Sequence, residues 1–348
     1  MEQTSLVQPM YSNDPVDFRD TERGLAAMKN AHEIIFQAEL HETKRSQGYH
    51  FTDTGETPFV WAERNGIEPR AYFLYTWPKP GNWYGPEREH ESDVYWLRKR
   101  LWHKLMNYPN WTRPSHIPNR PYTNLTVKAC REWIITTLIE TGIKRWMFDE
   151  MHMNNFRRMD KEQVEGNIEI LKALHAEGHD IVANGGWHMS DPDDEVWTYP
   201  AMNWLSGAMT EYSAGYGDGL PDPETGKWWD LNEERLLRVQ QDWIDAGRTF
   251  YIVCRWRPNE TKYKDYESFA LEHIKLSYSW YMPAQYNYFI SNWLPKFKYW
   301  LKNPVDPPTP PTQAHVSIPR QKIPMTVLVD GQEYLSEVVI QGSDSILL

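Results

Sequence analysis

Short apolar runs with the length of β-strands alternate with amphipathic runs with helical spacing along most of this chain, and this alternation constrains the fold more than any other feature. The strand-like runs are residues 34–38, 71–77, 144–150, 180–184, 208–212 and 249–254, with a further one near Leu276, and the clearest helical runs are 94–106, 124–140, 161–176 and 231–246. Strands that alternate with helices at such intervals pair in parallel through right-handed crossovers. The sequence therefore predicts an α/β fold with a parallel sheet.

The number of strand-like runs, about seven, is close to the eight strands of a (β/α)8 TIM-type barrel. We expect the missing strand between residues 83 and 123, where a long aromatic stretch is hard to assign. An open, doubly wound sheet is the rival architecture. It would carry a glycine-rich phosphate-binding turn after its first strand, and no such turn follows residues 34–38. The barrel is the favoured prediction.

A proline-rich stretch divides the chain near its C-terminal end. Residues 304–312 read PVDPPTPPT, which excludes helix and favours an extended linker. Beyond it, two β-branched runs flank Asp330-Gly331, a dipeptide typical of hairpin turns. We therefore expect a barrel domain over residues 1–303, the linker, and a small β-rich segment over residues 313–348. That segment is either a separate appendage or a pair of strands that returns to close the main domain.

Charge and composition exclude several functional classes. The chain has 37 Lys and Arg against 48 Asp and Glu, a net charge of −11 that repels nucleic acid. No apolar run approaches the ~20 residues that a membrane-spanning helix needs. Its two cysteines, Cys130 and Cys254, are too few for a disulfide scaffold and lack the spacing of metal ligands. The N-terminus has no signal-peptide pattern, so we expect a cytoplasmic or virion-associated protein rather than a classically secreted one.

Acidic residues stand where two of the expected strands end. Asp149 and Glu150 close the run at 144–150, and Glu211 lies near the end of the run at 208–212. The functional face of an α/β barrel is the rim at the C-terminal ends of its strands. Cleavage of a glycosidic bond needs two carboxyl groups, one that donates a proton and one that stays ionised. We predict Asp149 and Glu211 as this pair. Since side chains alternate along a strand, Glu150 is a supporting or substitute acid.

Other interpretations of the same residues stay open. A carboxylate at the end of a strand can also cap the next helix or pair with an arginine. His152 and His188, together with Asp149, Glu150 and Asp191, could hold a divalent ion, as in metal-dependent barrel deacetylases. No HxH or HExxH spacing supports a metal, so no cofactor is predicted.

The predicted substrate-binding residues are aromatic or polar and flank the same strand ends. The chain contains 18 Trp and 20 Tyr, whose flat rings stack on the apolar faces of sugars. Asn184 can hydrogen-bond a sugar hydroxyl or a catalytic carboxylate. Gly185 and Gly186 permit either close approach of a ligand or a tight turn. The predicted set is Asn184, Trp77, Trp83, Trp187, His188, Tyr212, Arg255 and Trp256.

Three short sequence motifs between Ala129 and Glu211 are the basis of a family resemblance. They are Glu140-Thr141-Gly142 leading to Phe148-Asp149, then Val182-Ala183-Asn184-Gly185, and finally residues 207–212, GAMTEY. In this order and spacing the chain resembles glycoside hydrolases of the hypothetical glycosyl hydrolase type, which are related in pattern to polygalactosaminidase-like barrels. The resemblance implies a TIM-type barrel, a glycan substrate, and Asp149 with Glu211 as the acidic pair. Glu150 and Lys144-Arg145 depart from the family pattern.

The leading hypothesis is a glycoside hydrolase that acts on a polysaccharide or cell-surface glycan. In it Glu211 donates the proton, Asp149 is the nucleophile or base, and Asn184 positions a hydroxyl or carboxylate. The alternative is a non-catalytic glycan-binding or structural barrel within a larger assembly, such as a phage virion, with a protein partner bound through residues 304–348. Metal-dependent deacetylation of a carbohydrate is a third hypothesis.

Overall fold

The computed structural model describes sixteen stretches of the chain, which form two compact units, Met1–Pro307 and Pro308–Leu348. The division between the units falls inside the proline-rich stretch at 304–312. Each unit is presented by itself. The described residues are 5–10, 29–42, 45–46, 49–50, 56–76, 96–114, 121–149, 151, 161–185, 203–212, 233–256, 268, 270–271, 280–285, 321–329 and 332–340.

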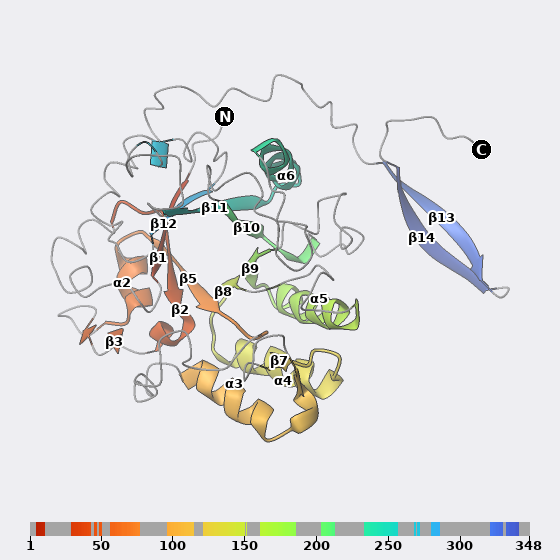
Figure 1. The fold of residues 1–348 in the computed structure, drawn as a ribbon, viewed down its shortest axis with the longest axis horizontal. Helices are drawn as coiled ribbons and strands as arrows, with labels where there is room; N and C mark the ends of the chain where they lie inside the picture. Colours follow the sequence, from red (N-terminus) through yellow and green to blue (C-terminus); the bar gives the residue numbers. More distant parts are fainter. Residues whose placement is uncertain are drawn as a thin grey trace. The chain divides into compact units, whose positions relative to one another are not determined.

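Eight parallel strands form a closed barrel in the first unit (Figure 1). Each strand pairs with its neighbours in chain order, and the first strand also pairs with the last, which closes the ring. The α/β class and the parallel sheet are thereby confirmed. The strands are β1 (Ser5–Met10), β2 (Glu33–Gln37), β5 (Glu68–Phe73), β8 (Arg145–Phe148), β9 (Asp180–Asn184), β10 (Gly207–Tyr212), β11 (Thr249–Trp256) and β12 (Trp280–Gln285).

The expected position of the eighth strand was wrong. The strand missing from the sequence prediction is β1, near the N-terminus, and not a segment between residues 83 and 123. In that interval the only strands among the described residues are a short antiparallel pair, β6 (Thr112–Arg113) and β7 (Tyr122–Thr123), which lies outside the ring. A similar small pair is formed by β3 (Arg45–Ser46) and β4 (Tyr49–His50). The last barrel strand begins at Trp280, after the region expected around Leu276.

Helices in the connections cover the outside of the ring (Figure 1). Helix α4 ends where predicted, because Gly142 adopts φ 73°, a left-handed conformation that stops a helix and that glycine adopts without strain. The helices are α2 (Pro58–Arg64), α3 (Trp96–Met106), α4 (Lys128–Glu140), α5 (Lys161–Ala176) and α6 (Glu233–Asp245), with short 3-10 turns η2 (Ala38–His41) and η4 (Pro109–Trp111). None of the helices within the described stretches is long and apolar enough to cross a membrane.

Alternation along the strands separates two sets of buried side chains. Outward-facing residues such as Phe36, Trp146 and Phe250 belong to the large core beneath the helices. Inward-facing residues fill the ring itself and form a second, separate cluster. This interior layer consists of Ile35, Tyr72, Met147, Val182, Met209 and Tyr251. It separates the two ends of the barrel.

Charged side chains fill the ring at the N-terminal ends of its strands. Arg70 Nε donates to Glu33 Oε2 at 3.0 Å, and its two terminal nitrogens donate to Asp180 Oδ1 and Oδ2 at 3.0 and 3.1 Å. Arg145 bonds both acids, at 2.9 Å to Glu33 and 3.2 Å to Asp180. Glu33 and Arg70 are almost fully buried, at 0% and 2% exposure. We call Glu33, Arg70, Arg145 and Asp180 the basal ion network.

The network shifts the pKa values of its two acids in opposite directions. Burial raises the pKa of Glu33, against the opposing charges of Arg70 and Arg145. Burial also disfavours ionised Asp180, but the charge and hydrogen bonds of Arg70, a hydrogen bond from Ser206 and the charge of Arg145 outweigh it. They lower the pKa of Asp180 from 3.8 to about 2. Asp180 is therefore the member whose ionisation favours the folded state.

Asp180 should make the folded state sensitive to acid. Because its pKa is lower in the folded state than in the unfolded chain, its contribution is complete above about pH 4 and is lost as the pH falls toward about 2. The measurement is the free energy of unfolding in denaturant at several pH values. We expect Asp180→Asn to flatten the dependence in this window, and an unchanged slope would contradict the assignment.

The second unit contains a single described hairpin. Strands β13 (Gln321–Val329) and β14 (Gln332–Ile340) pair antiparallel, with Val329 opposite Gln332. The two residues between them, Asp330 and Gly331, lie outside the described residues, so the predicted turn stays a prediction. The barrel closes between β1 and β12 without these strands. Within the described residues, β13 and β14 pair only with each other and contribute no strand to the ring.

Candidate functional site

Asp149 follows β8 directly, and side chains from both neighbouring strands hold its carboxylate. Asn184 Nδ2, at the end of β9, donates to Asp149 Oδ1 at 2.7 Å. The hydroxyl of Tyr72, in β5, donates to Oδ2 at 2.7 Å. The backbone N–H of Asp149 donates to Phe73 O at 3.1 Å. The structure thus brings together Asp149 and Asn184, which the sequence predicted, and adds Tyr72.

The register of the sheet explains this convergence. Tyr72 is opposite Met147 in the ladder, and Met147 is opposite Val182. Asp149 and Asn184 each stand two residues beyond those inward-facing positions, so they face the same way, one level closer to the C-terminal rim. Tyr72 is buried, while Asp149 and Asn184 are partly exposed. The carboxylate of Asp149 therefore lies one level beyond the interior layer, toward the C-terminal ends of the strands.

Asn184 is held in place by a turn that follows it immediately. Gly185 adopts φ 77°, a left-handed conformation that favours glycine, and its N–H donates to Met209 O at 3.0 Å. This turn ends β9 and fixes the direction of the Asn184 side chain. Of the two sequence interpretations, the tight turn is therefore the one that holds for Gly185. Gly186 lies outside the described residues.

Glu211 stands near the end of β10, two residues after Met209 of the interior layer. Its backbone is opposite Val253 in the ladder with β11. Position 211 has the same parity along β10 as position 209. Only β9 lies between β8 and β10 in the ring. The backbone of Glu211 therefore lies two strands away from that of Asp149, near the same ends of the strands.

The remaining predicted residues divide into two groups. Arg255 and Trp256 end β11, and Tyr212 ends β10. In the ladder with β12, Arg255 is opposite Ala284 and Trp256 is opposite Gln285, and Tyr212 is opposite Cys254 of β11. The other predicted residues lie outside the described residues and keep the status of predictions: Glu150, Trp77, Trp83, Trp187 and His188.

The metal hypothesis rests largely on residues outside those described. His152, Glu150, His188 and Asp191 are not described, and Asp149 alone of that set is. Among the side chains that the structure does describe, no group of three or more His, Cys, Asp or Glu residues is arranged to hold a metal ion.

Tyr72 is the site residue that sequence reasoning missed. The apolar run at 71–77 placed the end of the strand at Trp77, whereas β5 ends at Phe73. The available signal was alternation: an arginine and a tyrosine two residues apart, Arg70 and Tyr72, share one face of a short strand. Only the partner strand shows that this face is the inside of the barrel.

A second polar network fixes the segments behind the site. Tyr75 donates its hydroxyl proton to Asn167 Oδ1 on α5, and Thr123 Oγ1 donates to Tyr75 O at 2.5 Å. Gln163 Nε2 donates to Thr123 O at 2.9 Å. The loop after β5, the β6–β7 pair and α5 are therefore tied together on the outer side of the strands that carry Tyr72 and Asp149.

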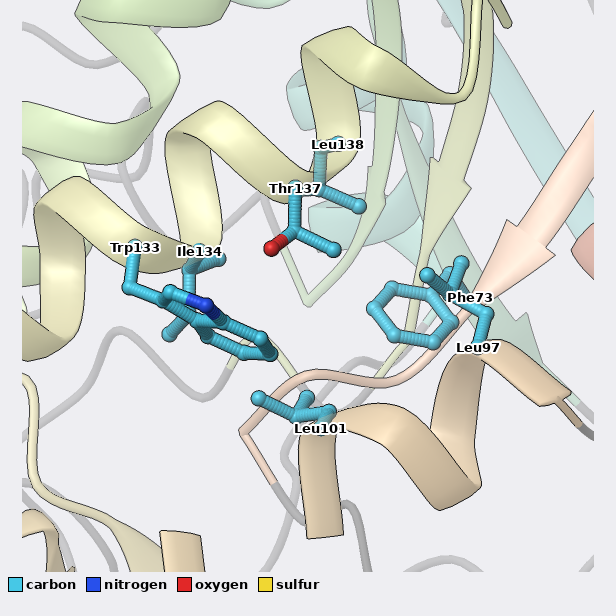
Figure 2. A pocket seen from close by; sticks show the side chains of 7 residues that line it. All are labelled: Phe73, Leu97, Leu101, Trp133, Ile134, Thr137 and Leu138. Carbon is cyan, nitrogen blue, oxygen red and sulfur yellow. The ribbon is translucent and has the colours of Figure 1, made fainter. Parts of the chain in front are cut away.

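A small pocket lies outside the ring, where β5 meets α3 and α4 (Figure 2). Its lining is apolar except for the hydroxyl of Thr137, and it does not include Tyr72, Asp149 or Asn184. Figure 2 shows side chains from the two helices and from Phe73 turned toward this space. Its position and lining mark a packing gap between helices and sheet rather than a substrate site. The lining residues are Phe73, Leu97, Leu101, Trp133, Ile134, Thr137 and Leu138.

No family model matches this chain, and no curated protein matches it. Glycoside hydrolases are among the solved structures to which it is similar. They include a class V chitinase from Pseudomonas fluorescens Pf-5 (9% identity, 72% of this chain, 68% of that chain, TM-score 0.37). A xylanase, Xyn10A from Cellvibrio japonicus, covers 81% of this chain and 86% of that chain at 8% identity and a TM-score of 0.40. The α-N-acetylgalactosaminidase NagBb from Bifidobacterium bifidum is 10% identical, and the match covers 86% of this chain and 50% of that chain with a TM-score of 0.45. Similarities this distant say nothing about what this chain does.

Proposed function

We propose that this chain is a TIM-barrel glycoside hydrolase that cleaves a polysaccharide with two carboxyl groups at the C-terminal rim of its barrel. The observation that carries the proposal is the Asp149 carboxylate, held at the end of β8 by a hydrogen-bond donor on each oxygen. Glu211 is the second acid, and its backbone lies two strands away, near the same ends of the strands. The proposed barrel domain spans residues 1–303, the linker 304–312 and the β-rich segment 313–348.

The contacts of Asp149 favour one assignment of roles. Both described hydrogen bonds are donated to its oxygens, so the carboxylate acts as an acceptor on both sides. This suits the nucleophile or base, which must present a lone pair to the sugar or to water. Glu211 then donates the proton to the leaving oxygen. Glu150 is a supporting or substitute acid.

The proposed substrate site extends from these acids across the rim. Asn184 orients Asp149, and Arg255 lies near the end of β11. Aromatic rings supply platforms for the apolar faces of the sugar, and polar groups bind its hydroxyls. The proposed binding set is Asn184, Trp77, Trp83, Trp187, His188, Tyr212, Arg255 and Trp256.

Release of reducing ends from a panel of polysaccharides tests this function. We expect the wild-type protein to release reducing ends from at least one acidic, neutral or amino-sugar polymer, and Asp149→Asn to release none. Binding of a polysaccharide without any release would contradict a hydrolase and favour the non-catalytic alternative.

The hairpin of the second unit favours that alternative, a structural barrel within an assembly. By register, all three charged residues of its strands, Lys322, Glu333 and Glu337, share one face. An isolated two-stranded hairpin is marginally stable in water, so its apolar face favours a partner. An uncharged face meets a second copy of itself without repulsion. The apolar positions are Ile323, Met325, Val327, Val329, Tyr334, Val338 and Ile340.

Substitutions at two adjacent positions of β13, one on each face of the hairpin, test self-association through the apolar face. We expect the wild-type chain to sediment as an oligomer, and Val327→Asp on the apolar face to sediment as a monomer, because burying a carboxylate is unfavourable. Thr326→Asp, on the other face, should sediment as wild type does. A wild-type chain that stays monomeric at every concentration would exclude self-association through the hairpin.

A further inference from the structure

We infer that Tyr72 is a positioning residue for Asp149, an inference that rests on the proposed function. Its hydroxyl donates to Asp149 Oδ2 at 2.7 Å, within the range of strong hydrogen bonds to a carboxylate. Its side chain is only 8% exposed, so the ring stays beneath the carboxylate rather than moving in solvent. Tyr72 therefore reaches the acid from inside the barrel.

The ring of Tyr72 is fixed by its surroundings. It belongs to the interior layer with Ile35, Met147 and Met209, whose apolar side chains fill the ring. Close packing restricts a buried aromatic side chain to one rotamer. The hydroxyl is consequently presented at one point in space, at the upper edge of this apolar layer.

Tyr72 and Asn184 hold opposite oxygens of the same carboxylate. Asn184 comes from β9 on one side of Asp149, and Tyr72 from β5 on the other. Two donors from different strands oppose rotation of the carboxyl group about its bond to Cβ. With Tyr72 removed, Asn184 still donates to Oδ1, and Oδ2 loses the hydrogen bond that opposes rotation on its side.

A comparison with Asp180 within the same barrel supports this role. Asp180 stands on β9 at the opposite end of the ring, where Arg70 binds both of its oxygens, at 3.0 and 3.1 Å. A guanidinium on both oxygens neutralises a carboxylate and suits a stabilising ion pair. The two described donors to Asp149 are a phenol and an amide, which are neutral. A phenol and an amide orient the carboxylate without adding a positive charge of their own.

The test is Tyr72→Phe, with Tyr75→Phe as the matched control. Each variant removes one hydroxyl from a buried tyrosine in the same segment, but the hydroxyl of Tyr75 bonds Asn167 and not Asp149. We expect Tyr72→Phe to lower kcat about 10- to 100-fold with little change in KM, the range that a hydrogen bond to a charged group supports. The unchanged KM distinguishes positioning of the catalytic carboxylate from a change in substrate binding.

Tyr75→Phe should lower thermal stability but leave kcat and KM within about 2-fold of wild type. An unchanged kcat in Tyr72→Phe, or an equal fall in kcat in Tyr75→Phe, would overturn the positioning role. A wild-type chain that hydrolyses nothing would contradict the proposed function, whereas an active wild-type chain matched in kcat by Tyr72→Phe would contradict the present inference.

Discussion

Asp149→Asn is expected to abolish polysaccharide hydrolysis, with a fall in kcat of about 10³-fold or more, while the protein stays folded. The amide has the size of the carboxylate but no charge, so it can neither attack the sugar nor take a proton from water. It still accepts a hydrogen bond on one atom, but it presents an amide N–H₂ to either Tyr72 or Asn184. The measurements are reducing-end release and thermal unfolding of the same preparation.

Glu211→Gln provides the comparison that separates the two roles. A proton donor matters less when the leaving group departs without protonation, so Glu211→Gln should retain activity on an aryl glycoside with an acidic phenol as leaving group. Asp149→Asn should stay inactive on that substrate, because the nucleophile or base is still needed. The reverse pattern would exchange the two roles. Wild-type rates in Asp149→Asn on every substrate would remove this residue from the mechanism.

Arg70→Met is expected to destabilise the fold by about 3–5 kcal/mol, the usual cost of breaking a buried ion pair from one side. Arg70 is 2% exposed and bonds Glu33, Asp180 and the backbone oxygen of Trp146. Methionine has a similar length but leaves Glu33 buried without this partner. The free energy of unfolding in denaturant measures the effect.

Lys128→Ala is the control for this prediction. Lys128 pairs with Glu132 at 3.5 Å one helical turn away, and both side chains are more than half exposed. An exposed pair of this kind contributes about 0.5 kcal/mol or less. If Arg70→Met cost no more than Lys128→Ala, the basal ion network would not be a main source of stability.

Local patterns predicted the elements whose own residues determine them. The bounds of α5, Lys161–Ala176, and of β9, Asp180–Asn184, agree with the sequence prediction. In α5, apolar residues such as Ile168 and Leu171 recur at helical spacing, and a glycine follows the helix. In β9 a short apolar run ends in Asn-Gly. Such signals lie within about 15 residues and need no partner.

The features that were missed depend on distant partners. The sequence of β1, SLVQPM, contains Gln8 and Pro9 and resembles a loop, and it becomes a strand because β2 and β12 flank it. The basal ion network joins Glu33, Arg70 and Asp180, which are separated by 37 and 110 positions. Strands are recognised in a sequence by their apolar residues, so charged residues within strands give no sign of their location. Their pairing becomes evident only when the closed ring brings the strands together.

Prediction of the candidate site from sequence was limited in the same way, by contacts between residues far apart in the chain. Asp149 and Asn184 were found because each ends a recognisable strand, so the general rule for barrels applied. Tyr72 was not found, because its partner is 77 positions away and its strand ends earlier than the apolar run suggests. Side-chain parity in a short strand changes with a one-residue shift, which only the ladder with β8 settles.

The interior layer has a consequence for how such a chain can change over evolutionary time. It separates the charged groups that we expect to stabilise the fold from the acid that we expect to perform the chemistry. We expect substitutions at the two ends of the ring to affect stability independently. Changes in the loops around Asp149 would then alter substrate specificity while the basal ion network continues to stabilise the barrel. One scaffold would in this way accommodate different sugars.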